Sequence, residues 1–366
     1  MTLKQNLSDL QQKARERTVK TQNIEYDLET LVKKIDKGTI KLDPDYQRRH
    51  RWDPITSSRL IESLILNIPI PIIYLSQDID VDTEVDEESR YSVIDGQQRL
   101  TAIVNFFTNN ITLTGLEALK ELEGLTYKQL PPFLIRRLEE RTIKCLRIDS
   151  TVDDQVKYDI FERLNSGSVK LEAQELRNAV ARGPFNEIIK NLAKNETFRI
   201  LIQVRNPDSD KKVQKMEDVE LVLRFFALSS GNYINLKKGF KQFLDDEMKR
   251  FNSLDNNAFK KMQIKFISTM DFIYKNFGDE PFAKFRYTGN AYKRMSKFNA
   301  AVFDSLAVSI ADNIIKDKKP ELSFDKVQGF KELFKDPEFF DATEGSVNDR
   351  EKVIRRIEAA INLFKK

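Results

Sequence analysis

Residues 95–99, in the order Asp-Gly-Gln-Gln-Arg, combine a carboxylate, two amides and a guanidinium, which are groups that handle phosphates. The preceding residues 91–94 are typical of a short strand, and Asp-Gly is typical of a turn. Apolar residues then recur from Leu100 to Phe107 at the spacing of a helix face. The sequence therefore predicts a strand, a tight turn and a helix whose first N–H groups and dipole attract an anion.

A structural explanation of the same motif is open as well. Asp95 would then serve only as the cap of the helix, and Gly96 only as the residue that permits the turn, as in many Asp-Gly pairs. Taken alone, the motif favours this structural explanation. Other parts of the sequence are needed to distinguish a structural role of the motif as a helix cap from a role in binding phosphate.

Length and composition limit the class of protein. With 366 residues and 40% hydrophobic content, the chain is long enough for two domains or one large one. Charged residues make up 32%, but the net charge is only +4, so any basic surface for nucleic acid has to be local. Cys145 is the single cysteine, and its β-like surroundings favour a buried thiol in a reducing compartment. Without a signal region or a long apolar stretch, we expect a cytoplasmic protein with no membrane partner.

Histidine occurs once, as His50, among three arginines. A metal site built from several histidines, a ββα-metal nuclease site or a multi-histidine phosphodiesterase centre therefore cannot be formed by this chain alone. The candidate chemistry is left to carboxylates, amides and arginines. We expect His50 to be solvated or to face a phosphate.

Local patterns predict the elements that position residues 95–99. Asp53 followed by Pro54 is typical of a helix start, with the carboxylate as N-cap. The acidic stretch 78–88 has no helical face, so we expect a solvated hairpin loop rather than a divalent-metal loop. Further strands are predicted at 39–42, 72–75 and 142–148, and helices at 28–37, 54–67, 133–140, 154–164 and 171–181.

The second half of the chain has a different character. Strand signals fade from about Met216 onward, and helical patterns follow one another to Lys366. The charge-rich stretch 195–215 is predicted to be the connection. We therefore expect an α+β domain at 1–200 and an all-helical domain at 201–366.

Three separated segments together resemble a known family. Segment 45–53 carries an aromatic-Gln-Arg run and a tryptophan. Segment 93–100 contains the full Asp-Gly-Gln-Gln-Arg signature, and segment 161–178 contains an Arg-Leu-Asn run and a Gln-Glu-Leu-Arg-Asn run. In this order they resemble the DGQQR-motif family with a ParB/sulfiredoxin-like domain, best known as the N-terminal domain of GmrSD restriction endonucleases. The resemblance implies a ParB/sulfiredoxin-like small mixed sheet with helices in roughly the first 200 residues, followed by a helical half.

The resemblance also implies a nucleoside triphosphate, of unspecified base, that several members hydrolyse. Asp95 would position water or a hydrated Mg²⁺ ion, and Arg99 would neutralise phosphate charge. The implied catalytic residues are Asp95, Gln97, Gln98 and Arg99. The implied nucleotide contacts are Gln47, Arg48, Gly96, Arg163, Asn165, Arg177 and Asn178. Arg177 has an alternative role in a structural ion pair with Glu175.

The sequence departs from the best-known members because no histidine follows His50, so HNH nuclease activity is not expected. The resemblance implies a nucleotide-hydrolysing component of a DNA restriction or phage-defence system, with DNA, a separate nuclease subunit or a second copy of the chain as partners. One alternative is a ParB-like nucleotide-dependent clamp. Another is a non-enzymatic DNA-binding adaptor that uses Arg48, Arg49, Arg51, Lys237, Lys238 and Lys241.

Overall fold

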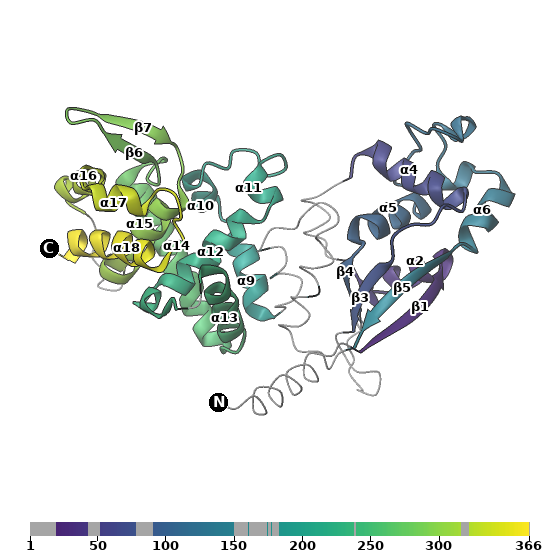
Figure 1. Ribbon diagram of the computed structural model, residues 1–366, viewed down its shortest axis with the longest axis horizontal. Coiled ribbons are helices and arrows are strands. Elements are labelled where there is room, and N and C mark those ends of the chain that lie inside the picture. Colours follow the sequence, from purple (N-terminus) through teal and green to yellow (C-terminus); the bar gives the residue numbers. More distant parts are fainter. Residues whose placement is uncertain are drawn as a thin grey trace, which may run out of the picture. The chain divides into compact units, whose positions relative to one another are not determined.

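The computed structural model describes residues 20–42, 52–77, 91–149, 183–237, 239–315 and 322–365, together with Ile160, Gln174 and Arg177 (Figure 1). The chain divides into two compact units, Met1–Lys170 and Leu171–Lys366, which we call the sheet domain and the helical domain. No helix in the described part is long and apolar enough to span a membrane. The predicted loop at 78–88 lies outside the described residues, as do the predicted helices at 154–164 and 171–181 except for the three single residues.

A five-stranded mixed sheet is the centre of the sheet domain. Its strands are β1 (Thr21–Asp27), β2 (Ile40–Lys41), β3 (Ile73–Gln77), β4 (Tyr91–Asp95) and β5 (Thr142–Ile148). They lie in the order β1-β5-β3-β4-β2; the β1–β5 and β3–β4 pairs are antiparallel, and the β3–β5 and β2–β4 pairs are parallel. This confirms the predicted small mixed sheet, including the hairpin partnership of β3 and β4. The prediction missed β1, an exposed edge strand without apolar alternation.

Four helices pack with this sheet and with one another: α2 (Leu28–Asp36), α4 (Pro54–Ile65), α5 (Gln97–Phe107) and α6 (Pro132–Glu139). The predicted start of α4 is confirmed, because Asp53 Oδ1 accepts a hydrogen bond from Thr56 N at 2.6 Å and Pro54 occupies the first turn. Ile61 of α4 and Ile103 of α5 are fully buried in one apolar core with Ile73 of β3. Residues of β3, α4 and α5 thus share the core that anchors the β4–α5 junction.

One carboxylate of α4 anchors the loop that follows α5. Glu62, which is 7% exposed, accepts hydrogen bonds from the backbone N–H groups of Glu117 (3.2 Å), Ala118 (2.7 Å) and Leu119 (2.7 Å). Burial acts to raise the pKa of the Glu62 carboxyl, but these N–H groups outweigh it and hold the pKa below its ordinary value. The loop is thereby fixed against α4 by a charged acceptor.

Replacing Glu62 by Gln is expected to lower the free energy of unfolding by about 2 kcal/mol near neutral pH, because a neutral acceptor binds the three N–H groups more weakly. The carboxyl pKa is lower in the folded chain than in the unfolded one. Its stabilisation is therefore complete above the unfolded pKa of about 4.3 and is lost as the pH falls through the lowered value. Denaturant titrations of Glu62→Gln and of the exposed control Glu117→Gln test this; equal losses in both, or a Glu62→Gln loss that persists in acid, would contradict it.

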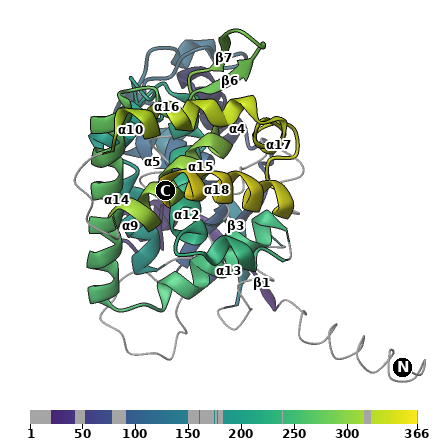
Figure 2. The ribbon, with the colours of Figure 1, turned by 90° about the vertical axis from the view of Figure 1, so that its left-hand side faces the viewer.

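The helical domain is built around one helix that is buried on all sides. Every residue from Ala301 to Ile310 in α15 is buried, and α15 packs against α12, α14 and α18 (Figure 2). The α-helices of this domain whose bounds the structure describes are α9 (Pro184–Leu192), α10 (Glu196–Leu201), α11 (Lys211–Gln214), α12 (Glu217–Leu228), α13 (Phe240–Asn252), α14 (Asn256–Phe277), α15 (Ala300–Ile310), α16 (Phe324–Glu332), α17 (Pro337–Ala342) and α18 (Arg350–Lys365).

The unit boundary falls before α9 rather than at residue 200, and residues 195–215 are not a connection. They contain α10 and α11, and Phe198 and Leu201 are fully buried in the core of the helical domain. High charge density misled the prediction, because the charged side chains of this stretch lie on the outer sides of helices whose apolar side chains are buried. The predicted connection at 195–215 was therefore wrong.

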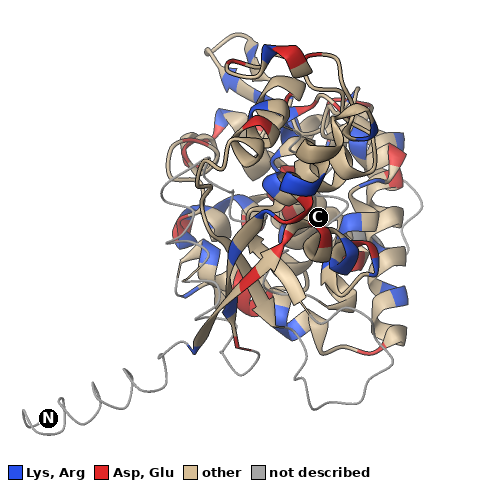
Figure 3. Cartoon of the chain, turned by 90° about the vertical axis from the view of Figure 1, so that its right-hand side faces the viewer, with Lys and Arg blue, Asp and Glu red and all other residues tan. Residues whose placement is uncertain are grey.

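The second half is helical, as predicted, but it is not all-helical. β6 (Lys284–Tyr287) and β7 (Tyr292–Ser296) form an antiparallel two-stranded ribbon. A sequence signal was present, since Gly289-Asn290 between two short aromatic-containing runs is typical of a hairpin. Over most of the described elements, Lys and Arg are interspersed with Asp and Glu (Figure 3), which agrees with the small net charge.

Candidate functional site

The β4–α5 junction has the predicted strand–turn–helix form. β4 ends at Asp95, Gly96 adopts φ +100°, and α5 begins at Gln97. Gly96 is the N-cap residue, and no side chain caps the helix. Asp95 is thus not the cap of α5, and the capping explanation of the motif is wrong. The positive end of the helix dipole carries no carboxylate cap.

Gly96 is required for two physical reasons. Its positive φ is strained for residues with a side chain. A Cβ atom at this position would also lie 2.4 Å from Ile73 Cδ1 and 3.3 Å from Arg99 Nη2. The turn therefore packs directly on β3, with no room for a side chain.

Arg99 is 8% exposed, and three oxygen atoms accept hydrogen bonds from its guanidinium group. It donates to the carbonyl oxygens of Pro71 and Ile72, and its Nη2 donates to Asp95 Oδ2 at 2.6 Å. Burial lowers the pKa of Arg99, and the charge of Asp95 opposes that shift. Arg99 thus ties the chain before β3 to the first turn of α5, a positioning role that the sequence did not reveal.

A cavity of about 570 Å³ lies along one side of α5. Gln98 is on its wall: the Gln98 Oε1 atom accepts a hydrogen bond from Trp52 N at 3.2 Å, whereas Nε2 is buried and has no hydrogen-bond partner among the described residues. Leaving a buried N–H donor unpaired costs about 1–3 kcal/mol. The polar and aromatic residues of the described lining include Trp52, Gln98, Thr101, Asn105, Asn110 and Thr112.

Sequence reasoning missed most of this wall. Thr101 and Asn105 follow Gln98 by three and seven residues, so the three polar side chains share one face of α5. This polar stripe beside the apolar face was a readable signal. Trp52 and Asn110 reach the cavity from other segments, and local spacing could not reveal them.

Several predicted site residues lie outside the described residues: Gln47, Arg48, Arg163, Asn165 and Asn178, as well as His50 and Glu175. The DNA-contact candidates Arg49, Arg51 and Lys238 also lie outside them, whereas Lys237 and Lys241 are exposed side chains of the helical domain.

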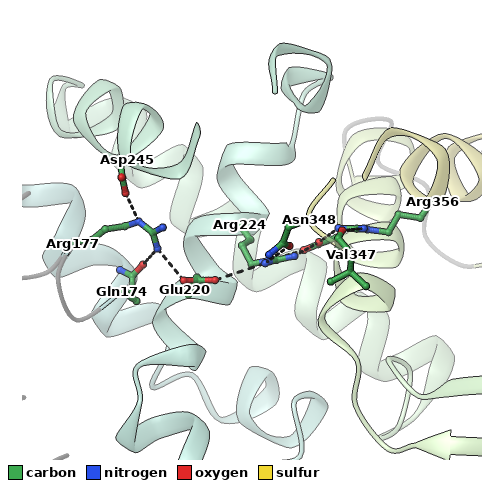
Figure 4. A network of polar contacts seen from close by, with 9 residues as sticks. Gln174, Arg177, Glu220, Arg224, Asp245, Val347, Asn348 and Arg356 are labelled. Carbon is green, nitrogen blue, oxygen red and sulfur yellow. Dashed lines mark hydrogen bonds and ion pairs between the residues drawn. The ribbon is translucent and has the colours of Figure 1, made fainter. Parts of the chain in front are cut away.

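Arg177 belongs to the helical domain, where its side chain is 2% exposed. Its Nε donates to Asp245 Oδ1 at 2.6 Å, and its Nη1 donates to Glu220 Oε2 at 2.9 Å (Figure 4). Burial raises the pKa of the Asp245 carboxyl, and the neighbouring Arg177 opposes that shift. These contacts give Arg177 a structural ion-pair role with partners other than Glu175.

The same network continues into the centre of the domain. Glu220 lies 3.7 Å from Arg224, and Arg224 donates to both carboxylate oxygens of Asp304, at 3.0 and 2.5 Å. Arg356 Nη2 donates to Asp304 Oδ2 at 2.6 Å, and both of these side chains are 0% exposed (Figure 4). Three buried arginines and three carboxylates of the helical domain are thus joined in one chain of contacts.

Comparison with protein families identifies residues 28–181 as a match to the model of the GmrSD restriction endonuclease, N-terminal domain. No curated protein and no solved structure matches the chain. The matched region contains the whole β4–α5 junction, the cavity wall and Arg177. The match over residues 28–181 therefore confirms the resemblance to the GmrSD restriction endonuclease N-terminal domain that the three sequence segments indicated.

Proposed function

We propose that the sheet domain binds a nucleoside triphosphate at the start of α5 and hydrolyses it, as a component of a DNA restriction or defence system. One observation carries the proposal: at the wall of a 570 Å³ cavity the Gln98 amide nitrogen is buried, and no described residue pairs with it. A ligand acceptor at this position would recover the cost of the unpaired donor.

The other features of the junction fit a triphosphate. A helix N-terminus without a carboxylate cap attracts an anion. Gly96 supplies the positive φ that begins the helix there while the turn packs on Ile73. Arg99 would contribute its charge from behind Asp95 rather than as a free side chain. The unspecified base of the nucleotide would extend toward the uncharged described lining of the cavity.

Asp95 would be the protein carboxylate for a hydrated Mg²⁺ ion. Its side chain is 39% exposed, and the Oδ2 atom is engaged by Arg99. Among the described residues no group of three His, Cys, Asp or Glu side chains is arranged to hold a metal ion, so phosphate oxygens and water would supply most ligands. Because the sequence holds one histidine, DNA cleavage itself would fall to a separate nuclease subunit. Both proteins would act in the cytoplasm.

Replacing Gln98 by Glu is expected to weaken triphosphate binding at least tenfold, or by about 1.4 kcal/mol, because it places a negative charge beside the phosphates. Glu keeps an oxygen for the hydrogen bond from Trp52 N, so the fold should be retained. The matched control is Gln129→Glu, which adds the same charge at an exposed position and keeps the capping-box acceptor for Thr126.

Calorimetric titration with ATP, GTP, CTP and UTP in the presence of Mg²⁺ measures binding, and phosphate release from the same samples measures hydrolysis. The site is supported if the wild type binds at least one nucleotide, if Gln98→Glu weakens that binding, and if the affinity of Gln129→Glu stays within about twofold of the wild-type affinity. If the wild-type chain binds none of the four, with or without duplex DNA, the proposal is wrong.

A further inference from the structure

The β6–β7 ribbon of the helical domain carries an unusual concentration of positive charge. It projects beyond the neighbouring helices (Figure 1), and its tip, residues 288–291, is exposed. From Lys284 to Lys297 the sequence contains five basic residues and no acidic one. In a chain whose net charge is only +4, this local excess requires an explanation.

The register of the ribbon places two cations opposite each other. Arg286 pairs with Lys293 across the antiparallel strands, and both are exposed. Like charges directly opposite in a β pair are destabilising. The Arg286 guanidinium lies 3.7 Å from Glu344 and 5.2 Å from the centre of the Phe340 ring, whereas Lys293 forms no ion pair with any described residue. The ribbon therefore keeps this cation pair at a cost to its own stability.

The other side chains of the ribbon explain how it is held. Phe285 packs edge-on against Phe334 with a ring separation of 5.9 Å, and Tyr287 lies 5.1 Å from Tyr292 across the strands. The Lys331 ammonium lies 4.6 Å from the centre of the Phe285 ring. Alternation along a strand places Lys284, Arg286 and Lys293 on the opposite side. There Lys284 is buried against the Phe340 ring, and Arg286 lies over the same ring but stays exposed, as does Lys293.

Nearby acids compensate only part of the charge. Glu280 receives both Arg294 and Lys297, and its pKa is held below the ordinary value by the hydrogen bond from Lys297 and the charge of Arg294. Glu344 is the only other carboxylate within ion-pair distance of the ribbon cations among the described residues. Lys284 is buried and donates to the Thr343 carbonyl oxygen, so four exposed cations, Arg286, Lys293, Arg294 and Lys297, share two carboxylates and leave the exposed surface of the ribbon positive.

We propose that the β6–β7 ribbon binds duplex DNA by entering its major groove, with Arg286 and Lys293 contacting phosphates. A two-stranded ribbon fits a B-DNA major groove of about 12 Å width, whereas the deep, narrow major groove of A-form RNA excludes it. The exposed tip residues Thr288 and Asn290 carry a hydroxyl and an amide suited to base edges. This inference is independent of nucleotide binding in the sheet domain.

The test compares the salt dependence of DNA binding by the full chain. A fluorescent duplex of about 25 base pairs is titrated by anisotropy between about 50 and 200 mM salt. The double variant Arg286→Gln/Lys293→Gln should bind about tenfold or more weakly at 0.1 M salt, and the slope of log K against log salt should fall by about 1.8, or about 0.9 for each lost phosphate contact.

The control variant Lys260→Gln/Lys261→Gln removes the same charge from exposed positions of α14 and should leave the slope unchanged. If the double ribbon variant is less stable by thermal melting, Lys293→Gln alone should still lower the slope by about 0.9. Equal slope changes in ribbon and control variants, tighter binding to single-stranded RNA or an acidic polypeptide than to the duplex, or no duplex binding by the wild type would overturn the proposal. Nucleotide titrations of the same proteins separate this outcome from the proposed nucleotide site.

Discussion

Replacing Asp304 by Asn is expected to lower the free energy of unfolding of the helical domain by about 3–5 kcal/mol, a large share of the stability of a typical domain. Asp304 is fully buried and accepts hydrogen bonds from both Arg224 and Arg356. Asn has almost the same shape as Asp, so the loss of stability comes from charge. In the variant, the two buried guanidinium groups no longer have the negative carboxylate that they share in the wild type.

Thermal melting and denaturant titration measure the change, and Glu338→Gln is the control. Glu338 also pairs with an arginine, Arg355, at 3.7 Å, but both side chains are exposed, so its removal should cost no more than about 0.5 kcal/mol. Comparable losses in the two variants would show that burial does not amplify the effect at Asp304.

Replacing Gly96 by Ala is expected to abolish nucleotide binding and to lower the free energy of unfolding by about 2–4 kcal/mol. Alanine at φ +100° is strained, and its Cβ would lie 2.4 Å from Ile73 Cδ1. Either β3 or the first turn of α5 has to shift, and the shift would separate Gln98 from the cavity wall that it shares with Trp52. Nucleotide titration and denaturant unfolding measure the two effects.

Gly124→Ala separates backbone strain from the close approach. Gly124 has φ +80°, and an added Cβ would meet no atom within 4 Å, so only the strain of about 1–2 kcal/mol is expected there. In addition, Ile73→Ala combined with Gly96→Ala should restore part of the nucleotide affinity by making room for the Cβ. Nucleotide binding by Gly96→Ala equal to that of Gly124→Ala would refute the tight junction as part of the site.

The sequence predicted those elements whose information is local. The N-cap of α4 at Asp53, the β4–α5 junction and the Cys145 strand were all confirmed, and Cys145 is buried, which raises the pKa of its thiol to about 12. Each has its apolar spacing or its turn residues within a few positions. The ribbon at 284–296 carried a weaker hairpin signal, which the surrounding helical patterns outweighed.

The contacts of the site could be predicted less well than its position. Arg99 was assigned to phosphate from its motif, but its carbonyl acceptors, Pro71 and Ile72, lie on a segment that only the folded sheet brings near. Arg177 likewise pairs with Asp245, a residue 68 positions away. A motif indicates which side chains are available, whereas the acceptors that compete for each charge depend on tertiary packing.

The polar composition of β1 has a consequence for how the protein behaves in a crowded solution. β1 is the outermost strand next to β5, and an edge strand offers free backbone groups to any other strand that approaches. Gln22, Asn23 and Glu25 are exposed along it, and a hydrophilic edge with a charged residue disfavours edge-to-edge pairing with a strand of another molecule. The lack of apolar alternation that concealed β1 from pattern reading is thus also its protection against aggregation.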